Sequence, residues 1–249
     1  MIAHIDYLNH SYKINLAAPI DISLPMYDRT GNVNAFHIPE PQFRPIVVGN
    51  YTGSVALGAG SNCEVLTLSP HGNGTHTECI GHITKERHTI NQCLKQFWFV
   101  AELISVEPFK MVNDDTIILK ETIAEKMRAK NAEALIIRTL PNIDTKASKN
   151  YSGKNPTYLH WNAAKYIREL GIKHLLIDLP SIDREEDGGE MLAHKSFWNY
   201  PDSPALWQTI TELIYVPNHI EDGIYLLNLQ IAPLETDASP AKPILYKIL

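Results

Sequence analysis

The sequence is poor in the features that mark secreted, disulfide-rich and membrane-spanning proteins. Only three of its 249 residues are cysteines, Cys63, Cys79 and Cys93, and none of them forms a CxxC motif. An odd number of isolated cysteines predicts reduced thiols and a cytoplasmic location. No segment approaches the roughly 20 apolar residues of a membrane-spanning helix. The opening residues MIAHIDYLNHSYKINL lack the basic segment and apolar stretch of a signal peptide, and we expect none.

Positive charge is scarce as well. The net charge is −6, and no basic run exceeds two residues. This pattern gives no electrostatic footprint for nucleic acid and argues against an anionic membrane surface as partner. With 44% hydrophobic and 20% charged residues, the composition is that of an ordinary globular protein. Repeats, low-complexity stretches and obvious linkers are missing, so we expect a single domain over residues 1–249.

Hydrophobic patterning predicts a mixed α/β fold. Short apolar runs separated by Gly, Pro and Asn make the first hundred residues β-rich. Strands are predicted at 14–16, 46–48, 64–68, 97–106, 134–137, 174–179 and 224–231, and helices at 120–130 and 161–170. Gly171 occupies the expected C-terminal cap of the second helix. Because that helix lies between two buried strands, the order implies a parallel crossover.

The segment HGNGTHTECIGH, residues 71–82, is the most informative part of the chain. It holds three histidines and a glutamate among glycines. His76, Glu78 and His82 all have even numbers, so an extended segment would turn them to one side. Imidazole nitrogens and a carboxylate converging in this way are ligands that Zn²⁺ and similar divalent metals prefer. Cys79 lies inside the segment and is interpreted as a small buried filler.

The motif and several further segments, in order along the chain, resemble those of a known family. GTHTE at Gly74–Glu78, followed by His82, resembles the HxGTHxDxPxH motif of the metal-dependent cyclase family, a group that includes bacterial kynurenine formamidases and isatin hydrolases. IDISLPM, LIIRT, LLIDLPSID, DGIYLLNLQIAPL and SPAKPI resemble the other conserved segments of that family. The resemblance extends over almost the whole chain.

The resemblance implies a swivelling β/β/α-type fold, a homodimer or larger homo-oligomer, and arylformamidase-like hydrolysis of a small-molecule amide, lactam or related acyl C–N bond. It implies His76, Glu78, His194 and Glu212 as metal ligands and His82 as the histidine that transfers protons. In chemical terms, the metal lowers the pKa of bound water, and the histidine returns a proton to the leaving nitrogen.

Three departures from the family motif stand out. Gly72 aligns with the first metal-binding histidine, and His71, one residue away, is the nearest substitute. Glu78 replaces an aspartate and adds a methylene, and Ile80 replaces a proline. These changes favour one metal over two, with zinc and manganese both suited to His and carboxylate ligands. They also keep open an alternative, a catalytically inactive small-molecule or metal-binding protein on the same fold. A structural zinc module is disfavoured because such sites are usually rich in cysteine.

Other conspicuous residues have less specific explanations. The acidic run Asp183–Glu190 lacks the alternating pattern of a calcium loop and is interpreted as solvated, near the site. The aromatic residues Trp198, Tyr200 and Trp207 either line a substrate pocket or anchor a long loop, and the second interpretation is favoured. The remaining histidines are interpreted as surface or core residues: His4, His10, His37, His88, His160, His174 and His219.

Overall fold

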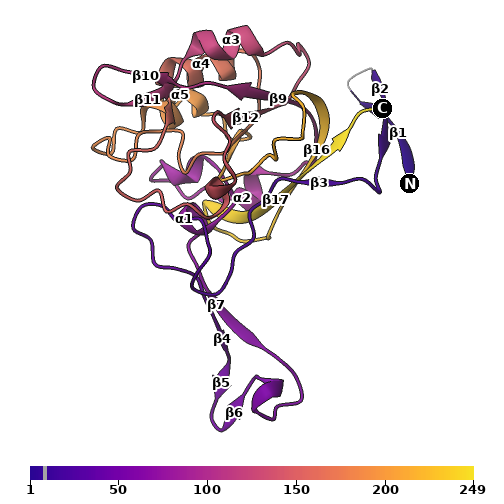
Figure 1. The fold of residues 1–249 in the computed structure, drawn as a ribbon, viewed down its shortest axis with the longest axis vertical. Coiled ribbons are helices and arrows are strands. Elements are labelled where there is room, and N and C mark those ends of the chain that lie inside the picture. The colour runs from indigo at the N-terminus through magenta and orange to yellow at the C-terminus, as the bar shows by residue number, and fades with distance from the viewer. Residues whose placement is uncertain (8–9) are drawn as a thin grey trace.

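A computed structural model describes residues 1–7 and 10–249. Its centre is a closed ring of seven strands, in the order β16 (Gly223–Ile231), β9 (Trp98–Val106), β12 (Ala134–Thr139), β14 (His174–Ile177), β15 (Thr209–Glu212), β8 (His76–Glu78) and β17 (Ala238–Lys247). β17 pairs with β16 to close the ring, and β3 (Ile20–Asp21) is added to β17 (Figure 1). The mixed α/β fold predicted from the sequence is confirmed.

Side-chain alternation along the strands separates two hydrophobic cores. Ile136 of β12 and Leu176 of β14 belong to a cluster shared with β9, β16 and β17, which fills the ring. Ile137 and Ile177, their next neighbours, belong to a second cluster shared with the helices. Strands with apolar residues on both faces are buried on both sides, as predicted for 97–106. The ring therefore has an inner core and an outer core.

Three helices cover the outer face near one end of the ring (Figure 1): α3 (Lys120–Lys126), α4 (Trp161–Glu169) and α5 (Leu192–Trp198). α4 turns Ala163, Ala164 and Ile167 toward the outer core. It ends where Gly171 adopts φ of +86°, a left-handed conformation that glycine tolerates. In the sequence, β12 precedes α4 and β14 follows it. The two strands pair in parallel, so the predicted crossover is confirmed.

The helix predicted at 120–130 is four residues too long. α3 ends at Lys126, and Met127 has extended dihedral angles. The Glu102 carboxylate of β9 accepts hydrogen bonds from the backbone N–H groups of Arg128 and Ala129, both at 2.8 Å. These bonds hold the chain in a bend that the hydrophobic spacing alone does not reveal.

Short elements complete the fold. They are α1 (Pro70–Asn73), α2 (Ile90–Cys93), β10 (Phe109–Lys110), β11 (Thr116–Ile118), β13 (Tyr158–Leu159) and the 3₁₀ turns η1 (Val55–Leu57), η2 (Ile80–His82) and η3 (Asp144–Ser148). Among the described residues, no helix is long and apolar enough to cross a membrane.

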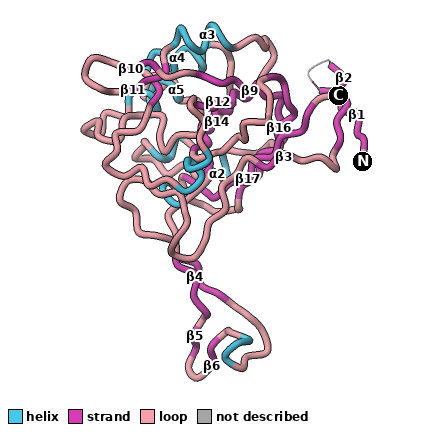
Figure 2. The backbone as a smooth tube through the Cα atoms, viewed as in Figure 1, coloured by secondary structure: helices cyan, strands magenta, loops and turns pink. Residues whose placement is uncertain are grey.

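Two hairpins extend from the body (Figures 1 and 2). One pairs β1 (Ile2–Tyr7) with β2 (His10–Asn15). The other is an arm built from β4 (Gln42–Pro45), β5 (Val47–Val48), β6 (Tyr51–Thr52) and β7 (Glu64–Thr67). Apolar side chains on this arm are solvent-exposed, among them Val47, Val48 and Leu57. An arm of this kind has no core of its own.

Candidate metal centre

The motif segment, residues 71–82, contains strand β8, which is hydrogen-bonded to a neighbouring strand along each of its two edges. β8 pairs with β15 and with β17, and Glu212 lies opposite His76 in the first of these pairings. Thr77 turns inward, where its hydroxyl contacts that of Thr211 at 2.8 Å. His76 and Glu78 therefore turn outward, and both are fully buried beneath the surrounding loops.

Glu78 lies at the centre of the cluster. Its Oε1 is 2.9 Å from His194 Nε2, and its Oε2 is 3.2 Å from His71 Nδ1 and 3.9 Å from His82 Nε2. The longer glutamate side chain, in place of the family's aspartate, thus reaches three imidazoles. His194 comes from α5, and its side chain is buried.

Glu212 and His76 form the other half of the cluster. His76 Nε2 lies 3.4 Å from Glu212 Oε2, and His194 Nε2 lies 3.8 Å from Glu212 Oε1. The backbone N–H of Ile182 donates to Glu212 Oε1 at 2.9 Å and fixes the carboxylate. All six residues proposed from the sequence are therefore brought together in space: His71, His76, Glu78, His82, His194 and Glu212.

Two aspartates complete the arrangement and were not proposed from the sequence. Asp237 Oδ2 lies 2.8 Å from His71 Nε2 and 3.2 Å from His82 Nδ1, so one carboxylate orients both rings. Asp183 Oδ2 lies 2.6 Å from His194 Nδ1. Asp183 opens the acidic run interpreted as a solvated loop, and for this residue that interpretation is wrong because its side chain is buried against α5.

The donor set fits a divalent metal ion. His76 Nε2 and Glu78 Oε2 are buried and have no hydrogen-bond partner among the described residues. Buried polar atoms are normally satisfied, because an unmade hydrogen bond costs about 1–3 kcal/mol. Potential ligand atoms form three groups of three residues, and within each group these atoms lie within 4.8 Å of one another. Each group contains His71, His82 or both. A cation would satisfy the two unpartnered atoms.

The electrostatics of the cluster favour positive charge. Burial opposes a charge on His194, but its contacts with Asp183 and Glu78 prevail and raise its pKa to about 10. The same balance, with Asp237 and Glu78 as partners, raises the pKa of His71 to about 10. Burial opposes the charge on Glu78, but the neighbouring imidazoles, His82 foremost, hold its pKa well below the usual range.

The close packing around Gly72 explains why His71 takes the place of the family's first histidine. A Cβ at Gly72 would lie 2.6 Å from Ile38 Cδ1 and 2.9 Å from the Ala35 carbonyl oxygen, so no histidine fits there. His71 takes that role from the preceding position of α1. The extended segment ends at Glu78, and η2 carries His82 back toward the cluster. The prediction of one extended segment through His82 is wrong, although His82 does reach the site.

We expect Gly81→Ala to destabilise the protein by about 3 kcal/mol, because its Cβ would collide with the backbone carbonyl oxygen of His88. The free energy of unfolding in denaturant measures this. Gly60→Ala is the matched control, because nothing lies within 4 Å of a Cβ at Gly60. Equal stability of the two variants would show that the turn carrying His82 tolerates a side chain.

A cavity of about 340 Å³ opens over the cluster. His71, His82, His194 and Glu212 are among its lining residues, together with the apolar side chains of Phe36, Ile38 and Met191. Trp198 does not line this cavity. It is fully buried, and its indole N–H donates to the Gln208 carbonyl at 2.9 Å, which agrees with a loop-anchoring role. Cys79 belongs to the inner core, as expected of a small filler.

Comparisons with known proteins show the family to which the chain belongs. The family model described as "Putative cyclase" matches residues 14–184, more than two thirds of the 249 residues. The kynurenine formamidase of Bacillus thuringiensis (strain Al Hakam) is 28% identical over 202 residues, which cover 79% of this chain and 83% of that protein.

Solved structures share the fold. A potential metal-dependent hydrolase with cyclase activity superposes with a TM-score of 0.65 at 21% identity, covering 92% of this chain and 98% of the other. An isatin hydrolase bound to the product analogue thioisatinate gives a TM-score of 0.63 at 13% identity, covering 93% and 92%. The chain belongs to the cyclase family.

Proposed function

We propose that this protein is a metal-dependent hydrolase that cleaves a non-peptide C–N bond of a small-molecule amide, such as a formamide or a lactam. The observation that carries the proposal is the pair of buried, unpartnered atoms, His76 Nε2 and Glu78 Oε2, in a cluster of four imidazoles and two carboxylates. Relatives named as kynurenine formamidases and a structural neighbour named as an isatin hydrolase support the same chemistry.

We assign metal binding to His71, His76, Glu78, His194 and Glu212. When bound, the metal supplies Lewis acidity, which lowers the pKa of water and polarises a carbonyl group. Zinc and manganese both suit this ligand set. One ion is favoured over two, because His71 Nε2 and Asp237 are already engaged with each other at 2.8 Å.

His82 is the proposed proton-transfer residue. The Asp237 carboxylate accepts a hydrogen bond from His82 Nδ1 at 3.2 Å, so His82 Nε2 faces Glu78 and the cavity. Its side chain is 28% exposed, whereas that of His76 is fully buried. A histidine that is oriented by a carboxylate and open to the cavity can take a proton from the attacking water and return it to the leaving nitrogen.

The cavity indicates the size and character of the substrate. A volume of about 340 Å³ accommodates a substituted aromatic ring, and Phe36, Ile38 and Met191 provide apolar walls. An arylformamide such as N-formylkynurenine is therefore the reference substrate for a screen, beside lactams and cyclic imides.

We also propose a homodimer or larger homo-oligomer located in the cytoplasm. The exposed apolar residues of the β4–β7 arm, Val47, Val48, Leu57 and Leu66, support the first part, because a folded monomer rarely leaves such a group of side chains in water. The isolated cysteines support the second part.

Metal content and turnover together test the proposal. Purified, tag-free protein is exposed to zinc and to manganese, and the moles of each metal per chain are measured beside hydrolysis of the substrate panel. We expect at least one ion per chain and metal-dependent release of the amine. A protein that binds metal without turnover, or one that stays empty under both metals, would contradict the hydrolase and favour the catalytically inactive small-molecule or metal-binding protein.

Metal affinity should rise with pH. Because the pKa values of His71 and His194 are raised to about 10 in the metal-free protein, both rings are positively charged at neutral pH. Metal ligands must be neutral imidazoles, so binding releases these protons and strengthens as the pH approaches 10. Calorimetric titrations at pH 7, in buffers of different ionisation enthalpy, count the protons. Zero protons released per metal ion would contradict the assignment of these two histidines as ligands.

A further inference from the structure

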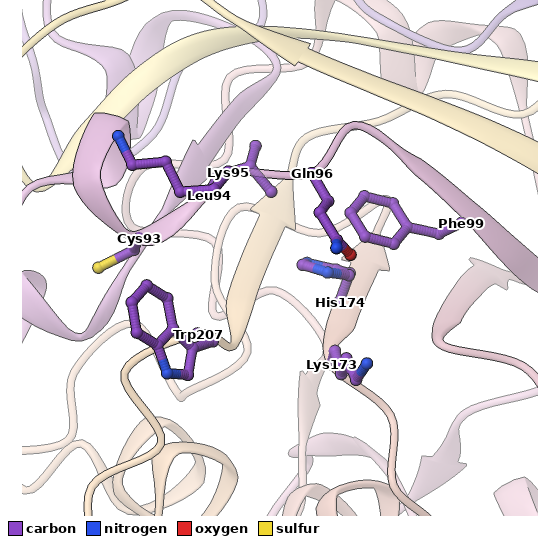
Figure 3. A pocket seen from close by; sticks show the side chains of 8 residues that line it. All are labelled: Cys93, Leu94, Lys95, Gln96, Phe99, Lys173, His174 and Trp207. Atoms are coloured by element: carbon purple, nitrogen blue, oxygen red, sulfur yellow. The ribbon is translucent and has the colours of Figure 1, made fainter.

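A second cavity, of about 330 Å³, lies apart from the metal centre. It is lined by residues at the start of β14 and β9 and in the segment after α2 (Figure 3). His174, in this cavity, pairs with Thr209 at the start of β15, whereas Glu212 of the metal centre is the last residue of that strand. Three residues of strand separate the two positions by about 10 Å. The two sites also use opposite faces of the strands: Phe99, which lines this cavity, belongs to the inner core, whereas Glu78 of the metal centre turns outward.

The floor of this cavity presents a buried polar group. His174 Nδ1 contacts the Thr209 hydroxyl at 2.9 Å, but Nε2 has no hydrogen bond to any residue that the structure describes. The side chain is more than nine-tenths buried, with 4% of the residue exposed. Burial, and to a lesser degree the charge of Lys173, lower the pKa of His174 to about 3, so the ring is neutral at physiological pH. A neutral imidazole is a directional hydrogen-bonding group for a ligand.

The walls are aromatic and apolar. The His174 ring lies against the ring of Phe99 with 3.9 Å between centroids. Figure 3 shows the Gln96 amide beside this pair and Trp207 across the opening, near Cys93. Trp207 is 65% exposed, although tryptophan is usually well buried on average. Flat walls of this kind favour a planar ring.

The rim carries positive charge. Lys95 and Lys173 are the charged residues that line the cavity, and no lining residue is acidic. Lys173 forms an ion pair with Glu133 Oε1 at 2.7 Å. Lys95 Nζ donates to the Asn91 carbonyl at 2.7 Å and interacts electrostatically with Glu235, but it forms no ion pair within 4 Å among the described residues. An anionic group on the ligand would therefore be attracted to Lys95.

We infer that this cavity is a second binding site, for a small aromatic carboxylate of one or two rings. The ring lies between Trp207 and Phe99, His174 Nε2 and the Gln96 amide beside it hydrogen-bond polar substituents, and a carboxylate at the rim is attracted by Lys95. The volume is within the range of small-molecule sites. This inference does not depend on the hydrolytic activity proposed for the metal centre.

Isothermal titration with 2-naphthoate tests the inference, with 2-naphthamide as the uncharged analogue. The full-length protein is titrated both metal-loaded and after chelation, because a carboxylate could also bind the metal. We expect one 2-naphthoate per chain in both preparations and weaker binding of the amide. Binding that disappears on chelation, or no binding of naphthoate at millimolar concentration, would overturn the inference.

Two variants with matched controls locate the binding. We expect Trp207→Ala to weaken 2-naphthoate binding about tenfold through lost stacking. Lys95→Ala should weaken it about threefold through loss of a solvent-exposed charge. Both residues are exposed, so the fold should persist, which thermal unfolding verifies. Trp161→Ala and Lys165→Ala, on the exposed face of α4, should leave the affinity unchanged. Equal affinities for Trp207→Ala and Trp161→Ala would place the ligand elsewhere.

Discussion

His82→Ala is expected to keep its metal and lose at least about a hundredfold in kcat, whereas His76→Ala loses both metal and activity. His76 is fully buried, and its Nε2 has no partner but the nearby Glu212 carboxylate. Its Nδ1 is held by the Gly74 carbonyl at 3.0 Å, which leaves Nε2 as the nitrogen that binds a cation. His82 is open to the cavity and hydrogen-bonded to Asp237, an arrangement that orients a proton-transferring ring.

The comparison requires metal content and kcat from the same preparations. His219→Ala is the control, because this histidine is exposed and lines neither cavity. Addition of imidazole should restore part of the activity of His82→Ala and none of that of His76→Ala. Equal metal loss in the two histidine variants would make His82 a ligand and end this division of roles.

The central features of the fold follow from local sequence patterns. Apolar runs at Ala134–Thr139 and His174–Ile177 are long enough to be recognised as buried strands, and the amphipathic α4 between them ends at a glycine. The metal-binding segment is recognisable for a related reason, because several chemically specific residues are packed into twelve positions.

The parts that were missed depend on contacts between distant residues. Asp237 lies 155 residues from His82 and 166 from His71, and no local pattern connects them. α3 ends earlier than predicted because of hydrogen bonds to Glu102, a residue of strand β9. The position of His71 depends on the space around Gly72, which Ile38 and Ala35 occupy. Of the two aspartates that orient the histidines, only Asp183 lies in a segment that resembles the family, LLIDLPSID, eleven residues before His194.

Asp183→Asn is expected to weaken metal binding by about 10- to 100-fold, although Asp183 is not itself proposed as a ligand. Its carboxylate accepts from His194 Nδ1 at 2.6 Å and from the backbone N–H groups of Ala193 and His194 at 2.7 and 3.0 Å. The charge holds the proton on Nδ1, so that Nε2 is the nitrogen that gives up its proton and binds a cation. Asparagine has nearly the same shape, but its NH₂ group would face one of these donors.

The same substitution should lower the free energy of unfolding of the metal-free protein by about 2 kcal/mol, because hydrogen bonds to a buried charge are lost. Competition with a chromophoric chelator measures metal affinity, and denaturant unfolding of the chelated protein measures stability. Asp28→Asn is the matched control, because its carboxylate accepts from the Phe43 N–H at 2.9 Å on the exposed surface. If Asp183→Asn lost stability but retained full metal affinity, Asp183 would be only the cap of α5. A loss in both would mean that one carboxylate holds the start of the helix and orients the imidazole that the helix delivers.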